Sequence, residues 1–142
     1  MKIAVFPGSF NPWHDGHEDV LKKALALFDK VIVARGYNPE KVQLRTAAFE
    51  PVFEKPPQPN IVWLGNWEYK EFSGLLVDFV KEVGACAVIK GLRNEKDFRF
   101  ELEQQYWNED LGLQVPTVYV ITDRQLVHIS SSAIRLLEKV KG

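Results

Sequence analysis

Short apolar runs alternate along the chain with longer stretches in which apolar residues recur at helical spacing. The short runs lie at residues 3–6, 31–34, 61–64, 85–89 and 118–121. Continuous apolar runs of this length are typical of strands that are buried on both faces of a sheet. The pattern therefore predicts a strand at each of these places.

Amphipathic stripes fill most of the segments between the runs. In these stripes apolar residues follow the i, i+3, i+4, i+7 spacing that gives a helix one apolar face, as expected for helices packed against a sheet. The helices predicted from these stripes lie at 21–28, 72–83 and 134–140. A further helix is predicted at 94–112, which is dense in charged and aromatic residues and whose exposed side is expected to meet a partner subunit or a ligand. The second of these helices is expected to begin at Phe72.

Strands that alternate with helices favour right-handed crossovers and a parallel sheet. We predict an α/β fold with a Rossmann-like, open, parallel five-stranded sheet, helices on both faces, and a single domain spanning 1–142. Residues 36–60 are rich in proline and carry no long stripe, so they are expected to form an excursion on the substrate side. Ligands of such sheets bind at the carboxyl ends of the strands.

The charge balance limits the classes of partner. The chain has 18 Lys and Arg against 19 Asp and Glu, a formal charge of −1, which argues against a surface that coats nucleic acid. Cys86 is the single cysteine, so neither an intrachain disulfide nor a Cys-rich zinc site can form. No apolar run is long enough to span a membrane. We therefore expect a cytoplasmic protein that binds neither nucleic acid nor membrane.

The first candidate for chemistry follows the first strand directly, at residues 7–17. Gly8 and Gly16 allow the backbone to approach a ligand closely, and the free amides at a helix start attract anions. His14 and His17 would lie together at that positive end, where an imidazole can donate to charge on a phosphate. Two alternatives stay open: a tight turn with incidental histidines, and a zinc site, for which no third ligand is evident.

Two further candidates follow later strands. Lys90 and Arg93 flank Gly91 at the end of the fourth strand and could hold phosphates, although such a turn is also typical of a solvated loop. The serines of 130–132 follow the fifth strand and could either cap a helix or cradle a phosphate. Because all three candidates lie at strand carboxyl ends of one predicted sheet, a shared nucleotide site is favoured.

These motifs resemble those of the bacterial phosphopantetheine adenylyltransferases, within the nucleotidyltransferase superfamily that carries a (T/H)xGH motif. The superfamily motif is His14-Asp15-Gly16-His17. The family-specific resemblance lies in 72–79, 90–101 and 129–132, so that it extends over nearly the whole chain.

The resemblance implies transfer of AMP from ATP to 4′-phosphopantetheine, giving dephospho-coenzyme A and pyrophosphate, with Mg²⁺ and in a homo-oligomer, a hexamer in the family. Catalytic roles are implied for His17, Lys41 and Arg93, and no metal site on the protein is expected. The implied ATP contacts are Ser9, Phe10, His14, His17, Gly91, Arg93, Glu101, Ser130, Ser131 and Ser132. The implied acceptor contacts are Ser9, Lys41, Leu75, Leu76, Lys90 and Asn108.

The chain also departs from the family pattern. Lys90 stands where the family usually has arginine, residues 42–58 do not follow the usual continuation after Lys41, and the chain ends early, which bears on the hexamer. Two other hypotheses stay open. One is a transferase of the superfamily that uses nicotinamide mononucleotide or glycerol phosphate as acceptor, and the other is a non-catalytic domain that senses nucleotides.

Overall fold

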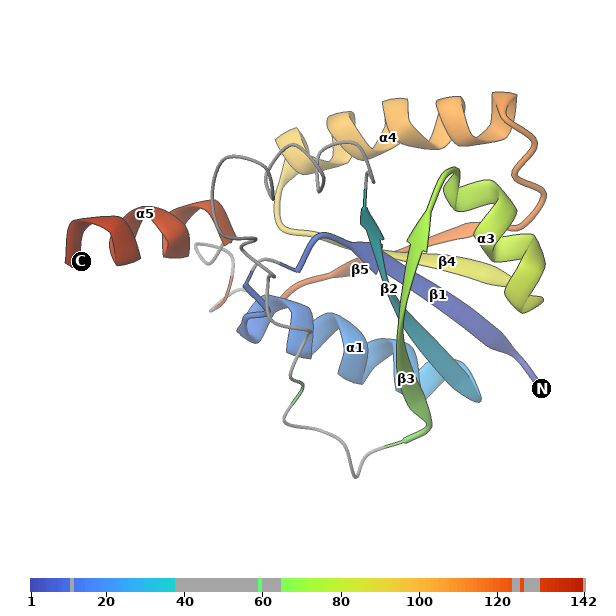
Figure 1. Ribbon diagram of the computed structural model, residues 1–142, viewed down its shortest axis with the longest axis horizontal. Helices are drawn as coiled ribbons and strands as arrows, with labels where there is room; N and C mark the ends of the chain where they lie inside the picture. The colour runs from blue at the N-terminus through green and yellow to red at the C-terminus, as the bar shows by residue number, and fades with distance from the viewer. Residues whose placement is uncertain (11, 38–58, 60–64, 124–125, 127–130, 142) are drawn as a thin grey trace, which may run out of the picture.

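The computed structural model describes residues 1–10, 12–37, 59, 65–123, 126 and 131–141 (Figure 1). Strands and helices alternate along most of this part of the chain. Their bounds are β1 (Ile3–Gly8), α1 (Asp15–Leu27), β2 (Lys30–Tyr37), β3 (Trp67–Ser73), α3 (Leu76–Val83), β4 (Ala87–Leu92), α4 (Glu95–Asp110), β5 (Thr117–Ile121) and α5 (Ser131–Lys141).

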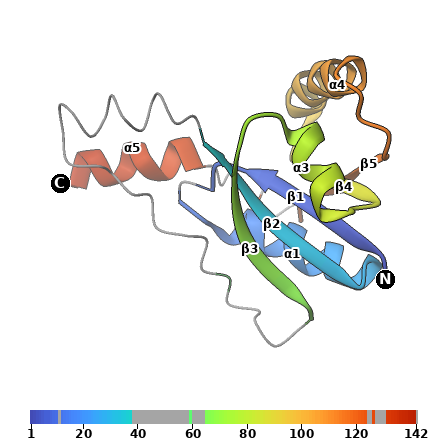
Figure 2. The same cartoon turned by 45° about the vertical axis from the view of Figure 1, so that its right-hand side comes forward.

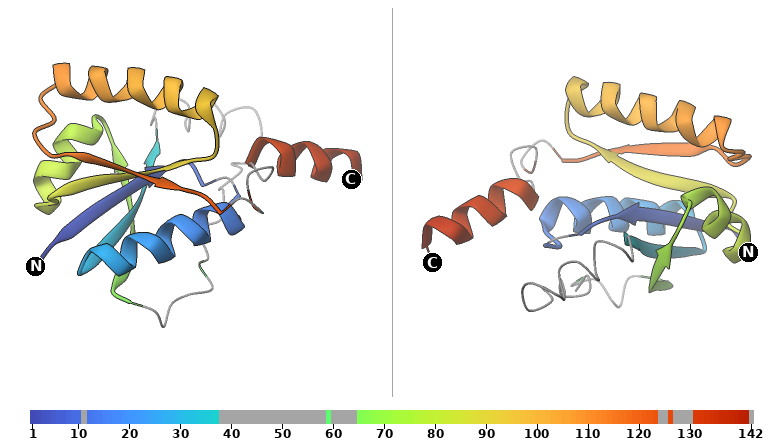
Figure 3. Two further views of the ribbon diagram at one scale, coloured as in Figure 1. Left: turned by 180° about the vertical axis from the view of Figure 1, so that it is seen from behind. Right: turned by 45° about the horizontal axis from the view of Figure 1, so that its top comes forward.

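The strands form one five-stranded sheet in the order β3-β2-β1-β4-β5, and every neighbouring pair is parallel. Helix α1 covers one face, while α3 and α4 lie on the other (Figures 2 and 3). The predicted fold class is therefore confirmed. No helix within the described ranges is both long and apolar enough to cross a membrane.

The two faces of the sheet carry separate apolar clusters, because successive side chains of a strand point to opposite sides. Ala4 and Phe6 of β1 pack with Leu21 of α1 in one cluster. Val5, between them, packs with Val77 and Val80 of α3 in the other. Strands covered on both faces are expected to be apolar throughout, which is why short apolar runs identified the central strands.

The third strand differs from its prediction. The run at 61–64 lies outside the described residues, and the strand that pairs with β2 is β3, Trp67–Ser73. Phe72 belongs to this strand rather than to a helix, and its ring stacks on Phe79 of α3 with centroids 4.7 Å apart. Gly74, at φ +89°, ends the strand, and α3 begins at Leu76. The contact between Phe72 and Phe79 explains the apolar spacing that suggested one continuous helix.

Candidate active site

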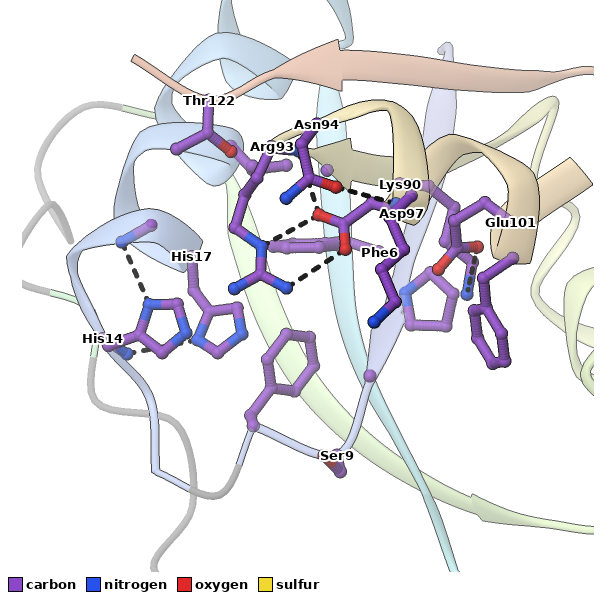
Figure 4. Close-up of a pocket in the computed structure, with 18 of the residues that line it drawn as sticks. Phe6, Ser9, His14, His17, Lys90, Arg93, Asn94, Asp97, Glu101 and Thr122 are labelled. Carbon is purple, nitrogen blue, oxygen red and sulfur yellow. Dashed lines mark hydrogen bonds and ion pairs between the residues drawn. The ribbon is translucent and has the colours of Figure 1, made fainter. Parts of the chain in front are cut away.

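A pocket of about 650 Å³ lies at the carboxyl ends of β1 and β4 (Figure 4). Its walls come from the end of β1 and the turn after it, the first two turns of α1, the end of β4 and the residues after it, and the first two turns of α4. Thr122 after β5 and Arg135 of α5 complete the lining. Eight of the predicted site residues line it: Ser9, Phe10, His14, His17, Lys90, Gly91, Arg93 and Glu101. The fold therefore gathers residues from four distant parts of the chain, 6–20, 90–101, 122 and 135, at one edge of the sheet.

Two histidines form a capping box at the start of α1. The N-cap residue His14 accepts a hydrogen bond at Nδ1 from the Gly16 N–H at 3.1 Å, and His17 Nδ1 accepts from the His14 N–H at 3.1 Å. Their rings stack with centroids 3.7 Å apart. Because each Nδ1 is an acceptor, this network assigns the proton of each neutral ring to Nε2. Both imidazoles can therefore donate from Nε2 to a ligand.

His17 is enclosed by aromatic rings, with the Phe10 and Trp13 centroids at 5.0 and 5.1 Å from its own. Burial, together with the charges of His14 and Arg93, lowers the pKa of His17 to about 3. Burial is also the main cause that lowers the pKa of His14, with Arg93 contributing. At neutral pH both rings are uncharged hydrogen-bond donors.

Glycines allow the close packing of this region. A Cβ at Gly8 would lie 2.9 Å from the Phe10 ring, and one at Gly16 would lie 2.8 Å from the His14 ring. At Gly91 a Cβ would lie 2.8 Å from a methyl carbon of Val20 in α1. The close approach that Gly91 permits within the protein is thus between β4 and α1.

Arg93, which precedes α4, is held in place by the carboxylate of Asp97 in the first turn of that helix. Its Nε donates to Asp97 Oδ2 at 2.9 Å and its Nη2 to Asp97 Oδ1 at 3.1 Å, while its backbone N–H also reaches Oδ2 at 3.1 Å. Burial alone would raise the pKa of Asp97, but the hydrogen bonds and charge of Arg93 together hold that pKa below its usual value. Asn94 caps α4 by accepting from the Asp97 N–H at 2.9 Å. Bidentate pairing fixes the plane of the guanidinium.

Lys90 has a looser partner. Its Nζ lies 3.5 Å from Glu101 Oε2, an oxygen that is buried and receives no hydrogen bond within the part of the chain that the structure describes. A buried oxygen in this state is ready to accept a donor from a ligand, such as a ribose hydroxyl.

The ionisable groups that line the pocket favour an anionic ligand. Four basic side chains and two carboxylates contribute to its walls: Lys90, Arg93, Lys96 and Arg135, with Asp97 and Glu101. Among the described residues there is no cluster of three or more His, Cys, Asp or Glu side chains that could hold a metal ion. The basic side chains and the imidazole donors make the pocket suited to phosphate groups.

Comparison with known proteins agrees with this geometry. Residues 5–137 match the cytidylyltransferase-like family. The phosphopantetheine adenylyltransferase of Cytophaga hutchinsonii is 42% identical over 146 residues, which cover 99% of this chain and 92% of that protein. The phosphopantetheine adenylyltransferase of Alkaliphilus metalliredigens is 39% identical over 147 residues, covering 100% of this chain and 88% of that protein. The chain belongs to the phosphopantetheine adenylyltransferase family.

Solved structures share the fold of this family member. A Vibrio parahaemolyticus protein described as a nicotinate-nucleotide adenylyltransferase matches with a TM-score of 0.58 at 23% identity, over 98% of this chain and 89% of its own. The lipopolysaccharide core biosynthesis protein of Thermoplasma volcanium matches with a TM-score of 0.52 at 21% identity, over 86% and 98%. At these identities the likeness shows the fold alone.

The remaining predicted site residues of this family member lie elsewhere. Leu75 is the half-exposed N-cap residue of α3, and Leu76 packs beside the cluster of Val5 and Val77. Asn108 lies near the end of α4, where its carbonyl accepts from the Leu113 N–H. None of Leu75, Leu76 and Asn108 lines the pocket, so their contacts with the acceptor stay predictions.

Four other predicted site residues lie wholly or partly outside the described part of the chain. Lys41 and Ser130 lie outside the described residues. Ser131 and Ser132 begin α5, and their side chains also lie outside the described part. No role was predicted for Asp97, because Arg93 precedes α4 and their ion pair depends on how the chain enters this helix.

Proposed function

We propose that this chain transfers AMP from ATP to 4′-phosphopantetheine, yielding dephospho-coenzyme A and pyrophosphate, a step of coenzyme A synthesis. The observation that carries the proposal is the shared pocket. Neutral imidazoles from α1 and cations from β4 and α4 line one space, in a chain 42% identical over nearly its full length to a protein of that name.

The chemistry is an in-line displacement at the α-phosphorus of ATP. A phosphate oxygen of the acceptor forms the new P–O bond while the bond between the α-phosphorus and its bridging oxygen breaks, and pyrophosphate leaves with the electron pair. The acceptor phosphate is already anionic near neutral pH, so no general base is needed. Positioning and stabilisation of charge supply the catalysis.

The described residues supply that stabilisation with fixed donors. The Nε2–H of His17 would donate to a phosphate oxygen as negative charge develops, and its orientation is already set by the bond from His14. The guanidinium of Arg93 would stabilise the triphosphate in the orientation that Asp97 imposes. Lys90 would hold the acceptor phosphate as a point charge, since lysine lacks the planar fork of arginine. Lys41 is proposed to bridge the two substrates, on the resemblance alone.

Magnesium belongs to the same proposal as part of the substrate. The described residues offer no three-ligand cluster, so the ion would enter bound to the oxygens of ATP and neutralise part of the triphosphate charge. The surroundings fit such a complex, because Arg93, held by Asp97, and Lys90, 3.5 Å from Glu101, present two positive charges to the phosphates.

A cytoplasmic location and a homo-oligomer are further parts of the proposal. Exposed aromatic side chains on α4, outside the pocket lining, support self-association: Tyr106 is 56% and Trp107 67% exposed. Light scattering coupled to size-exclusion chromatography would measure the mass in solution. A hexamer is expected from the resemblance, and a monomer of 16.3 kDa at all concentrations would contradict it.

The activity is tested by pyrophosphate release from MgATP with three acceptors in separate reactions: 4′-phosphopantetheine, nicotinamide mononucleotide and glycerol phosphate. Release only with 4′-phosphopantetheine is expected. Release only with nicotinamide mononucleotide would assign a different acceptor, and no release with any acceptor would favour a nucleotide sensor.

Two arginines of the same region provide a matched pair of variants. Arg93 and Arg99 each pair with a carboxylate four residues away on or beside α4, but Arg93 lines the pocket while Arg99 is 81% exposed. Arg93→Met is expected to lower kcat/KM by about 100-fold, as for loss of one preorganised donor. Arg99→Met is expected to leave kcat/KM unchanged. Equal effects of the two substitutions would argue against a role of this pocket.

A further inference from the structure

Arg35, at the carboxyl end of β2, is a charged side chain with only 6% of its surface exposed. It lies outside the lining of the pocket, and instead contacts the backbone behind it. Its Nε donates to the Ser9 carbonyl at 2.8 Å, and its Nη2 donates to the Phe10 carbonyl at 3.0 Å. The ring of Tyr69 in β3 lies 5.8 Å from the guanidinium carbon and packs against it. The guanidinium is therefore fixed against two consecutive carbonyls of the turn that follows β1.

The backbone that Arg35 holds is unusual. Phe10 has a φ of +48°, in the left-handed region that side-chain-bearing residues seldom occupy. Such a conformation persists only where surrounding contacts impose it. Two hydrogen bonds from a buried cation, to the carbonyls on either side of the Phe10 Cα, are contacts of this kind.

Peptide geometry makes those bonds relevant to the pocket. In a trans planar peptide the carbonyl and the N–H point in opposite directions, so binding of the Ser9 carbonyl by Arg35 turns the Phe10 N–H away from Arg35. Arg35 is in register with Gly8 on the β2 side of β1, whereas β4 lies on the other side. The Phe10 N–H is therefore directed away from Arg35, in a turn whose residues Ser9 and Phe10 both line the pocket.

Phe10 also supports the catalytic histidine. Its ring is 2% exposed and meets the His17 ring edge-on, with centroids 5.0 Å apart and an interplanar angle of 83°. It also packs edge-on against Phe6 at 5.1 Å. A rotation of the Phe10 backbone would move both this ring and the amide, so Arg35 influences two donors at once.

We propose that Arg35 is a positioning residue for the nucleotide. It holds the Ser9–Phe10 peptide so that the Phe10 N–H donates to a phosphate of ATP, and it keeps the Phe10 ring against His17. This inference rests on the proposed function, because it takes the pocket to be the site of MgATP.

The test compares Arg35→Met and Arg35→Lys with Lys30→Met, a control on the same strand that removes the ion pair of Lys30 with Glu68 at the opposite end of β2. Isothermal calorimetry measures the Kd for MgATP, and kinetics give kcat and the KM of each substrate. Arg35→Met is expected to weaken MgATP binding by about tenfold or more, in line with loss of hydrogen bonds from a charged group. Arg35→Lys should recover part of the affinity, since an ammonium can reach one carbonyl but lacks the fork. Lys30→Met should bind MgATP as the wild type does, with unchanged KM values for both substrates.

A spectroscopic readout separates positioning from stability. In ¹⁵N spectra of the wild type, the Phe10 amide resonance is expected to shift on addition of MgATP, and this shift should be reduced in Arg35→Lys. A Phe10 amide that does not respond in a wild type that binds MgATP would overturn the proposal. So would variants that bind MgATP as tightly as the wild type. If Arg35→Met does not fold, Arg35→Lys decides by the same two measurements. A wild type that binds MgATP but transfers no AMP would contradict the proposed function. The role of Arg35 in binding MgATP would still be tested by the calorimetry and the NMR spectra.

Discussion

Replacing His17 by asparagine tests the electrostatics of the histidine pair. The amide oxygen of asparagine can still accept the hydrogen bond from the His14 N–H, so the start of α1 keeps its cap while the titratable ring is removed. The substitution also removes the ring contacts of His17 at every pH, so the comparison uses the pH dependence of stability rather than its absolute value.

The sign and size of that difference follow from the pKa of His17, which falls from 6.5 to about 3 on folding because the ring is buried near His14 and Arg93. Between these values the unfolded chain binds a proton that the folded chain does not. Stability is therefore greatest above pH 6.5 and falls as the pH drops toward 3. At about 1.4 kcal/mol per pKa unit, lowering the pH from 7 to 4.5 should remove about 3 kcal/mol of unfolding free energy through His17 alone.

Urea unfolding followed by tryptophan fluorescence at a series of pH values measures this quantity in both proteins. The wild type should lose about 3 kcal/mol more than His17→Asn between pH 7 and 4.5. The variant should keep a shallower dependence, since the pKa of His14 is lowered too. Parallel curves for the two proteins would refute the reasoning, as would an NMR titration in which the His17 ring protonates near pH 6.5.

The remaining expectations concern α4 and the cations beside it. Asp97→Asn should lower kcat/KM for ATP by about tenfold, because Arg93 loses its bidentate partner; unchanged steady-state kinetics would contradict this. Asn94→Ala removes the N-cap of α4 and should reduce the unfolding free energy by about 1 kcal/mol in urea titrations. An unchanged urea midpoint of unfolding would contradict this. Lys90→Met should raise the KM for 4′-phosphopantetheine more than the KM for ATP. A larger rise in the KM for ATP would indicate that Lys90 does not hold the acceptor phosphate.

The sequence was informative where local pattern and burial coincide. Strands β1, β2 and β4 are covered on both faces, so continuous apolar runs marked them. Strand β3 lies at the edge of the sheet and carries charged residues such as Glu68 and Lys70, which ion-pair at its surface. An edge strand of this composition has no continuous apolar run, and the prediction consequently extended the neighbouring helix back to Phe72.

Some residues of the candidate site were predictable from the sequence and others were not. His14, His17 and Arg93 were predictable because glycines and strand ends mark where side chains meet a ligand. The role of Arg35 was not predictable, because it depends on the carbonyls of Ser9 and Phe10, which lie 26 and 25 residues away in the chain. Backbone carbonyls carry no sequence signal. Only the parallel register of β1 and β2 brings Arg35 beside that turn.

Direct transfer of AMP to the acceptor phosphate is the central claim, and isotope labelling tests it most directly. The protein would be incubated with MgATP and 4′-phosphopantetheine whose terminal phosphate oxygens are ¹⁸O. The masses of both products would be measured by mass spectrometry. Bond formation between an acceptor phosphate oxygen and the α-phosphorus should give dephospho-coenzyme A that retains all of the label, with unlabelled pyrophosphate. Labelled pyrophosphate, or a product carrying the β- and γ-phosphates of ATP, would contradict the account.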